Sequence, residues 1–159
     1  MSEVFMHIAL ANFSLLSFTG PKMPADMKPD LEKTVTKKAD VIQWLPSEGL
    51  ARVDLVYPDP WPKRRHWKRR FVQDASLAEI GRVLRPGGEF RFVTDIPDYA
   101  AWTLERGLRS PDLAWTAERA DDWRLPWRGF TGTRYEAKAK REGRGPCYLI
   151  FRRRCGEPA

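Results

Sequence analysis

The amino-acid sequence predicts an α/β protein with a mostly parallel sheet, and three features carry this prediction. A short apolar strand pattern ends at Pro58, and a second one runs through residues 89–95. Between them, apolar residues recur at helical spacing and are followed by a Pro-Gly-Gly turn at 86–88. Strand, helix, glycine turn and strand form a right-handed βαβ unit, whose two strands are parallel.

The first strand is predicted in the segment ARVDLVYP. Val53, Leu55 and Tyr57 alternate with their neighbours, which is the period of a strand with two different faces. The run is short and ends at Pro58, because proline cannot donate a backbone hydrogen bond to a sheet. An open α/β sheet binds its ligands at the carboxyl ends of such strands.

The crossover helix is predicted over residues 74–85. Its apolar residues share one face, and they are Leu77, Ile80, Val83 and Leu84. Asp74 is expected to cap the first turn, and the Pro-Gly-Gly turn is expected to end the helix.

The second half of the chain is expected to add helices and strands to this unit. A helix capped by Asp98 is predicted over 98–108, a strand over 113–119 and a polar helix over 134–143. The segment 121–133 resembles a loop, since it is rich in Trp, Pro and Gly. A final strand over 146–154 is expected to run antiparallel and to exit into basic residues.

The N-terminal part has a different composition. Residues 4–18 form an apolar run, expected to be a buried helix or strand because it is short for a bilayer and lacks a basic flank. Residues 19–40 hold three prolines and many charges, as in a linker. We therefore expect a divergent N-terminal segment over 1–40, the α/β domain over 41–154 and a tail over 155–159.

Composition narrows the class of partner. The 159 residues suffice for one domain with a core, and 28 Lys and Arg against 21 Asp and Glu favour an anionic partner such as nucleic acid. Cys147 and Cys155 have neither metal-ligand spacing nor a disulfide framework, which fits a reducing cytoplasm. His7 and His66 lie too far apart to suggest a metal site. We expect no metal and no membrane partner, and the sequence does not indicate the oligomeric state.

Most of the candidate functional residues lie in residues 57–71, the segment YPDPWPKRRHWKRRF. Two prolines hold Asp59 on a stiff loop at the expected ligand edge, and six Lys or Arg follow between Lys63 and Arg70. A fixed carboxylate beside cations and aromatic rings suits a purine next to a phosphate backbone. The simpler alternatives are a solvated basic face, an Asp-Pro turn, and Trp61 and Trp67 as core residues.

The same segment resembles the signature of the bacterial tRNA (guanine-N7)-methyltransferase family, which uses S-adenosylmethionine. The resemblance continues through VLRPGGEFRFVTDIPDYA (83–100) and TRYEAKAKREGRGPCYLIFRR (133–153), and so covers about Val41 to Arg153. It implies a class I methyltransferase fold, a Rossmann-like sheet that is incomplete here. It also implies methylation of guanine N7 in the variable loop of tRNA.

Several site residues follow from the resemblance. Asp59 resembles the family's proposed catalytic aspartate, which also lies beside the cofactor, and Asp95 resembles a substrate-contacting aspartate. Lys63 resembles a substrate-binding lysine. The substrate segment of the family, T-[KR]-[YF]-E, matches Thr133, Arg134, Tyr135 and Glu136. The remaining basic residues are expected to hold RNA phosphates, and they are Arg64, Arg65, Lys68, Arg69 and Arg70.

These residue types suit the implied chemistry. Guanine N7 is a lone-pair nucleophile without a proton, so methyl transfer needs alignment more than a strong base. Asp59 or Asp95 can stabilise the positive charge that develops on the purine, or accept hydrogen bonds from its N1–H and amino group. Two structural alternatives stay open: Asp95 as a residue that starts a helix, and Thr133 with Glu136 as a capping box.

The sequence departs from the family pattern at its start. Upstream of Val41 the only glycine is Gly20, so the glycine-rich cofactor loop is not seen, and Lys37 or Lys38 stands where an acidic ribose ligand is expected. We therefore expect weak binding of S-adenosylmethionine or none. This leaves an RNA-binding remnant without catalysis as the first alternative, and a structural protein with an incidental basic face as the second.

Overall fold

The computed structural model describes Ile42 and residues 45–155, and the expectations for residues 4–18 and 19–40 lie outside this part. The chain divides into two compact units, Met1–Pro46 and Ser47–Ala159, and the elements below belong to the second. They are β1 Leu50–Val56, the 3-10 helix η1 Arg64–Arg69, α4 Asp74–Val83, β2 Leu84–Thr94, α5 Pro97–Arg109, β3 Leu113–Trp115, α6 Asp121–Arg124, α7 Arg134–Arg141 and β4 Cys147–Arg153.

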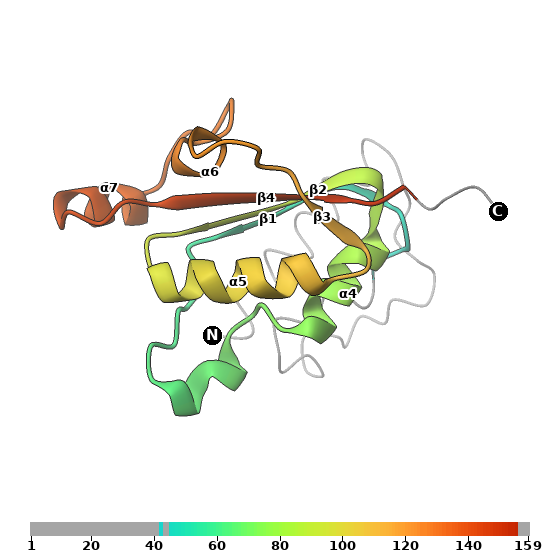
Figure 1. The fold of residues 1–159 in the computed structure, drawn as a ribbon, viewed down its shortest axis with the longest axis horizontal. Helices are drawn as coiled ribbons and strands as arrows, with labels where there is room; N and C mark the ends of the chain where they lie inside the picture. The colour runs from blue at the N-terminus through green and yellow to red at the C-terminus, as the bar shows by residue number, and fades with distance from the viewer. Residues whose placement is uncertain (1–41, 43–44, 156–159) are drawn as a thin grey trace, which may run out of the picture. The chain divides into compact units, whose positions relative to one another are not determined.

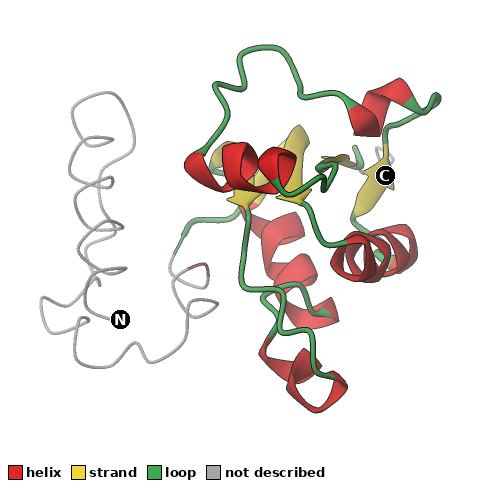
Figure 2. Ribbon diagram, turned by 90° about the vertical axis from the view of Figure 1, so that its left-hand side faces the viewer, coloured by secondary structure: helices red, strands yellow, loops and turns green. Residues whose placement is uncertain are grey.

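The four strands form one mixed sheet in the order β1-β2-β4-β3. β1 and β2 are parallel and joined through α4, which confirms the predicted βαβ unit. β4 runs antiparallel to both β2 and β3, as expected for the C-terminal strand. The α/β class predicted from the sequence is therefore confirmed. Figure 1 shows α4 and α5 on one side of the strands and α6 on the other, and Figure 2 shows helices on both sides of the strand ends.

The core lies between the sheet and the helices α4 and α5. Phe90, Phe92 and Phe151 are fully buried, and the rings of Phe90 and Phe151 stack with centroids 6.1 Å apart. A Cβ atom on Gly107 of α5 would stand 2.2 Å from the Phe151 ring, so only glycine permits this close approach of helix and sheet. The packing fixes α5 across the sheet, and with it the loop that joins β2 to α5.

Two predicted helix caps are wrong. The N-caps of α4 and α5 are Gln73 and Ile96, so Asp74 and Asp98 fall in the first helical turns. There the carboxylate of Asp74 lies 3.8 Å from Arg106, and that of Asp98 pairs with a buried arginine. Ion pairs with other segments, which a local pattern does not reveal, decide the position of both side chains.

The strand β2 begins earlier than predicted. It starts at Leu84 and contains the Pro-Gly-Gly turn, where the register against β1 shifts between Leu50 and Arg52. Gly87 has a φ of 74°, which suits glycine and accommodates this irregularity inside a strand. No helix in the described part of the chain is long and apolar enough to cross a membrane.

Candidate active site and RNA-contacting surface

The loop after β1 leaves the sheet beside the end of β2. The backbone N–H of Tyr57 donates to the carbonyl of Val93 at 2.9 Å, which extends the ladder by one residue. Tyr57 and Trp61 then adopt φ values of 48° and 43°, in the left-handed region that non-glycine residues rarely occupy. Asp59 lies between them and is exposed. Strained backbone on both sides of an exposed carboxylate is typical of a functional site.

Asp95 directly follows β2, at the same edge of the sheet. Its carboxylate is largely buried and accepts a hydrogen bond from Nε of Arg144 at 2.6 Å. Arg144 belongs to the loop between α7 and β4, so the ion pair joins two distant segments. Since the N-cap of α5 is Ile96, Asp95 does not cap that helix. The side chain is held across the sheet edge instead.

The segment 133–136 opens α7. Thr133 is the N-cap, and its Oγ1 accepts a hydrogen bond from the backbone N–H of Glu136 at 3.1 Å. The carboxylate of Glu136 does not return to complete a capping box. Its Oε1 accepts from the hydroxyl of Tyr148 at 2.7 Å and from Lys140, whereas its buried Oε2 has no partner among the described residues. Glu136 is 4 % exposed, and only one of its two carboxylate oxygens accepts hydrogen bonds from the described residues.

Tyr57 connects these segments, although the sequence did not single out its hydroxyl. Its ring stacks on that of Tyr135 with centroids 6.2 Å apart, and Tyr135 is 54 % exposed. Burial raises the pKa of the Tyr57 hydroxyl, and the negative charges of Glu136 and Asp95 raise it further. Both carboxylates thus lie close to one phenol group. The ends of β1 and β2 and the start of α7 converge on a single acidic and aromatic corner.

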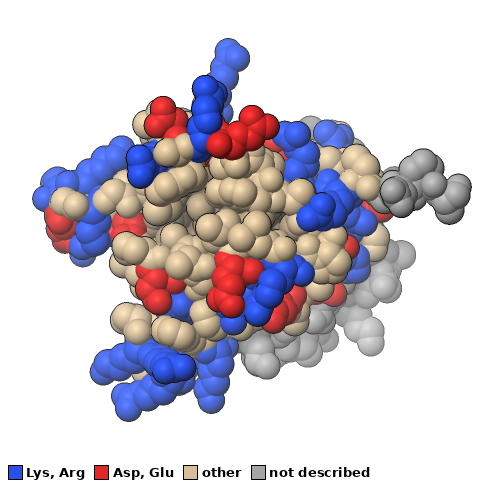
Figure 3. Space-filling model, viewed as in Figure 1, with Lys and Arg blue, Asp and Glu red and all other residues tan. Residues whose placement is uncertain are grey.

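The cations of the basic segment lie on η1 and just before it. Lys63, Arg64, Arg65, Lys68 and Arg69 are all exposed, and no ion pair in the described part of the chain uses any of them. The guanidinium of Arg69 lies 5.0 Å from the Trp61 ring and that of Arg64 lies 5.8 Å from the Trp67 ring. Lys and Arg side chains gather at the lower left of Figure 3, over η1, which projects below α5 in Figure 1.

Arg70 departs from the prediction for its neighbours. It is 2 % exposed, and its side chain turns away from solvent toward Pro60 and Asp98. A phosphate cannot reach a guanidinium that is enclosed in this way. The expectation that Arg70 contacts the RNA backbone is therefore wrong, and the residue is part of the scaffold beneath η1.

The buried carboxylate of Glu136 predicts a dependence of stability on pH. Burial alone would raise its pKa, but hydrogen bonds from Lys140 and Tyr148 outweigh burial and hold the pKa below the ordinary value. The stabilisation is thus present above the pKa of the unfolded chain and is lost as the pH falls through the lower, folded pKa.

We expect Glu136→Gln to lower the free energy of unfolding by about 2 kcal/mol near pH 7, the range for a hydrogen bond to a charged group. The difference from the original chain should shrink in urea unfolding below pH 4. Glu118→Gln, at an exposed position, is the matched control. A difference that stays constant down to pH 3 would contradict this account.

Comparison with known proteins identifies the class of this chain. Residues 33–149 match the family model described as "Putative methyltransferase". A tRNA (guanine-N(7)-)-methyltransferase from Nitrobacter hamburgensis is 65 % identical over 115 residues, which cover 72 % of this chain and 45 % of that protein. The protein of the same name from Bradyrhizobium diazoefficiens is 64 % identical over 115 residues, covering 72 % and 49 %.

The chain belongs to this methyltransferase family, and its resemblance to bacterial tRNA (guanine-N7)-methyltransferases is confirmed. The mixed sheet is part of a Rossmann-like methyltransferase fold, and S-adenosylmethionine is the methyl donor of the family. The chain spans about half the length of the curated relatives that it matches. Among the described residues, no group of His, Cys, Asp and Glu is arranged to hold a metal ion.

Two features of this chain bear on the binding of the cofactor. Asp59 is exposed at the carboxyl end of β1, where a carboxylate can face a bound ligand. A glycine-rich loop, whose free backbone N–H groups would receive the methionine end, is not found before β1, where Gly20 and Gly49 stand alone. The sequence before β1 thus does not show the glycine-rich pattern expected for the methionine end of the cofactor.

Proposed function

We propose that this chain carries the guanine- and tRNA-contacting part of a tRNA (guanine-N7)-methyltransferase. One observation carries the proposal: three segments bring Asp95, Glu136 and two tyrosine rings to one sheet edge, and the loop that leaves this edge after β1 leads into an exposed cationic helix. An acidic, aromatic corner suits the edge and face of a purine, and free cations suit phosphates. Membership of the methyltransferase family is the basis for proposing methyl transfer as the reaction.

The proposed roles follow from the contacts. Lys63 and the exposed cations of η1 hold phosphates, while Thr133, Arg134 and Tyr135 present the start of α7 to the nucleotide. The carboxylate of Asp95 accepts hydrogen bonds from guanine N1–H and its amino group, while the buried carboxylate of Glu136 holds the start of α7 in place through Tyr148 and Lys140. Arg144 already occupies Asp95, so the base exchanges with that guanidinium when it binds.

Methyl transfer leaves positive charge on the purine, and the carboxylate of Asp59 is proposed to stabilise it. N7 carries no proton, so no general base is required and alignment supplies most of the rate. S-adenosylmethionine, when bound, supplies the methyl group. The remaining work of the chain is to hold the guanine and its flanking phosphates in place.

A second candidate is an RNA-binding protein without catalysis. It is favoured by one observation, that the sequence holds the basic loop without a glycine-rich loop before β1. The two functions share tRNA binding and differ only in cofactor binding and methyl transfer. A single pair of measurements therefore distinguishes them.

We expect the purified chain to bind bulk tRNA and to give no saturable heat with S-adenosylmethionine at micromolar concentrations in calorimetry. The comparison is a chimera in which the part of the Nitrobacter hamburgensis relative that precedes its match to this chain is joined before residues 41–159. The chimera should bind the cofactor and transfer labelled methyl groups to tRNA. Micromolar cofactor binding by the chain alone would contradict the incomplete site, and a chimera that binds cofactor and tRNA without methylating would favour the second candidate.

A further inference from the structure

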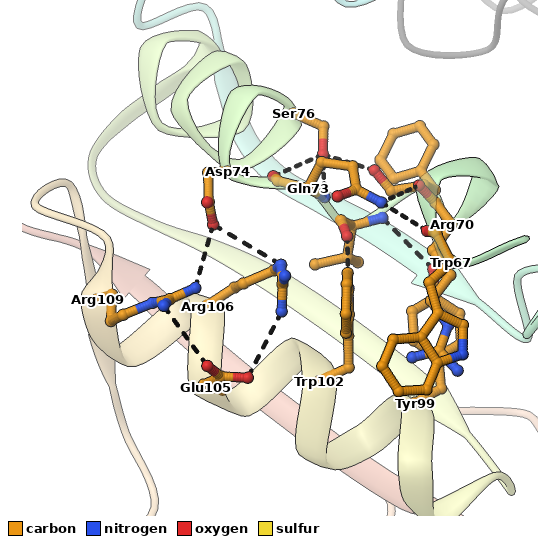
Figure 4. A network of polar contacts seen from close by, with 12 residues as sticks. Trp67, Arg70, Gln73, Asp74, Ser76, Tyr99, Trp102, Glu105, Arg106 and Arg109 are labelled. Carbon is orange, nitrogen blue, oxygen red and sulfur yellow. Dashed lines mark hydrogen bonds and ion pairs between the residues drawn. The ribbon is translucent and has the colours of Figure 1, made fainter. Parts of the chain in front are cut away.

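Arg70 is enclosed between η1 and α5, as Figure 4 shows. Its guanidinium carbon lies 4.7 Å from the Trp67 ring, 4.9 Å from the Tyr99 ring and 5.0 Å from the Trp102 ring. Removing a charge from water costs free energy unless the charge is paired. The hydrogen-bond partners of the enclosed guanidinium therefore indicate its role.

The guanidinium holds two segments that carry proposed site residues. Nε donates to the carbonyl of Pro60 at 2.8 Å, immediately after Asp59 in the chain. Nη2 pairs with Asp98, in the first turn of α5, which follows Asp95 closely. The Arg70 side chain therefore links the loop that carries Asp59 to the helix α5, which follows Asp95.

Asp59 itself lies close to the same cage. Burial raises the pKa of the Tyr99 hydroxyl, and the charge of Asp59 acts in the same direction while that of Arg70 opposes it. Both charges thus reach one buried phenol group. The hydrogen bond to Pro60 joins the backbone next to Asp59 to this cluster.

The residues that follow η1 are hydrogen-bonded to the same cluster. The amide of Gln73 donates to the carbonyl of Trp67 at 2.9 Å, which also accepts from the backbone N–H of Arg70, and to the carbonyl of Arg70 at 3.1 Å. Nε1 of Trp102 donates to the carbonyl of Val72 at 2.7 Å. These bonds fix the exit of η1 against α5, so Arg70 sits at the base of a loop held at both ends.

We propose that Arg70 is a positioning residue, which fastens the Asp59 loop and the cations of η1 to α5 so that base and phosphate contacts keep one geometry. The inference rests on the proposed function for its RNA contacts. A planar guanidinium can donate to Pro60 and Asp98 while its faces lie against aromatic rings. A lysine ammonium has neither the planar fork nor the stacking surface, so charge alone does not replace it.

The test compares Arg70→Lys, Arg70→Met and Asp98→Asn with Arg153→Met as the matched control. Arg153 also donates to a backbone carbonyl, that of Leu84 at 2.6 Å, but at the opposite edge of the sheet. Amide hydrogen exchange of residues 57–70 is measured by mass spectrometry on the full chain, and tRNA affinity by filter binding. Thermal unfolding of each variant identifies any that does not fold.

We expect both Arg70 variants to speed amide exchange in residues 57–70 about tenfold, because losing a hydrogen bond to a charged group changes an opening equilibrium by about that factor. Both variants should also weaken tRNA binding, although the exposed cations remain. Asp98→Asn keeps the bond to Pro60 and should give a smaller increase. Arg153→Met should leave exchange in 57–70 unchanged. Full tRNA affinity and slow exchange in Arg70→Lys would overturn the proposal, since they indicate that charge alone suffices.

The exchange measurement needs no RNA, so the two proposals fail separately. If the unaltered chain does not bind tRNA, the proposed function fails, and exchange still decides whether Arg70 fastens the loop. If Arg70→Met does not fold, Arg70→Lys and Asp98→Asn provide the answer. Unchanged exchange in both of these would overturn the positioning role.

Discussion

Replacing Lys63, Arg65 and Lys68 by glutamine is expected to weaken tRNA binding about 50-fold at 0.15 M monovalent salt. The estimate assigns one phosphate contact to each cation and about 0.7 counterions released per contact, as for single strands. These three side chains are exposed and make no ion pair within the described residues, so their loss should not destabilise the fold. The slope of log affinity against log salt should fall by about 2.

A matched control removes the same charge from the opposite edge of the sheet. Arg85, Arg109 and Arg154 are exposed, and they lie at the start of β2, the end of α5 and just past β4. Replacing all three by glutamine should change affinity less than threefold and leave the salt slope nearly unaltered. Equal losses in the two triple variants would indicate general attraction to a basic protein, and the basic face would then be incidental.

The elements were predictable where local pattern decides them. The βαβ unit follows from the alternation in β1 and the apolar face of α4, since neither depends on distant residues. The caps of α4 and α5 were not predictable in this way, whereas Thr133 caps α7 as the local pattern suggested. Asp98 has good capping chemistry, yet its partner Arg70 comes from a segment 28 residues away. A tertiary ion pair outweighs the local preference there.

The basic segment illustrates a similar limit. Six cations in eight residues look alike in a sequence, and all six were expected to contact the substrate or RNA phosphates. The turn of η1 instead leaves Arg70 beneath the others, where the chain returns to the core through buried Val72. The one available signal was this position, at the end of the run and next to apolar residues.

Three residues named by the resemblance, Asp95, Tyr135 and Glu136, lie around Tyr57, but the groups that join them were not foreseen. Tyr57 was predicted as a strand residue, and nothing in the pattern linked Arg144 to Asp95, 49 residues away. Such contacts arise only once β4 pairs with β2 in an antiparallel register and brings α7 to the sheet edge. Topology, rather than composition, creates the corner.

Replacing Asp59 by asparagine is expected to lower the rate of methyl transfer by about 100- to 1000-fold, the range for loss of one preorganised electrostatic group. The effect should appear in the chimera described above, measured as labelled methyl groups transferred to tRNA. Asparagine keeps the size of the side chain and removes only its charge. Binding of tRNA should change less than twofold, because Asp59 repels phosphates if it affects them at all.

Asp54→Asn is the matched control for this prediction. Asp54 is an exposed aspartate on β1 whose carboxylate pairs with Arg52 at 3.0 Å, away from the strand's carboxyl end. It should retain the full rate, which separates the loss of a particular carboxylate from a change in net charge. If methyl transfer survives in Asp59→Asn, the positive charge on the purine is balanced by another group. Asp95 is then the remaining candidate, since its carboxylate becomes free once the base displaces Arg144.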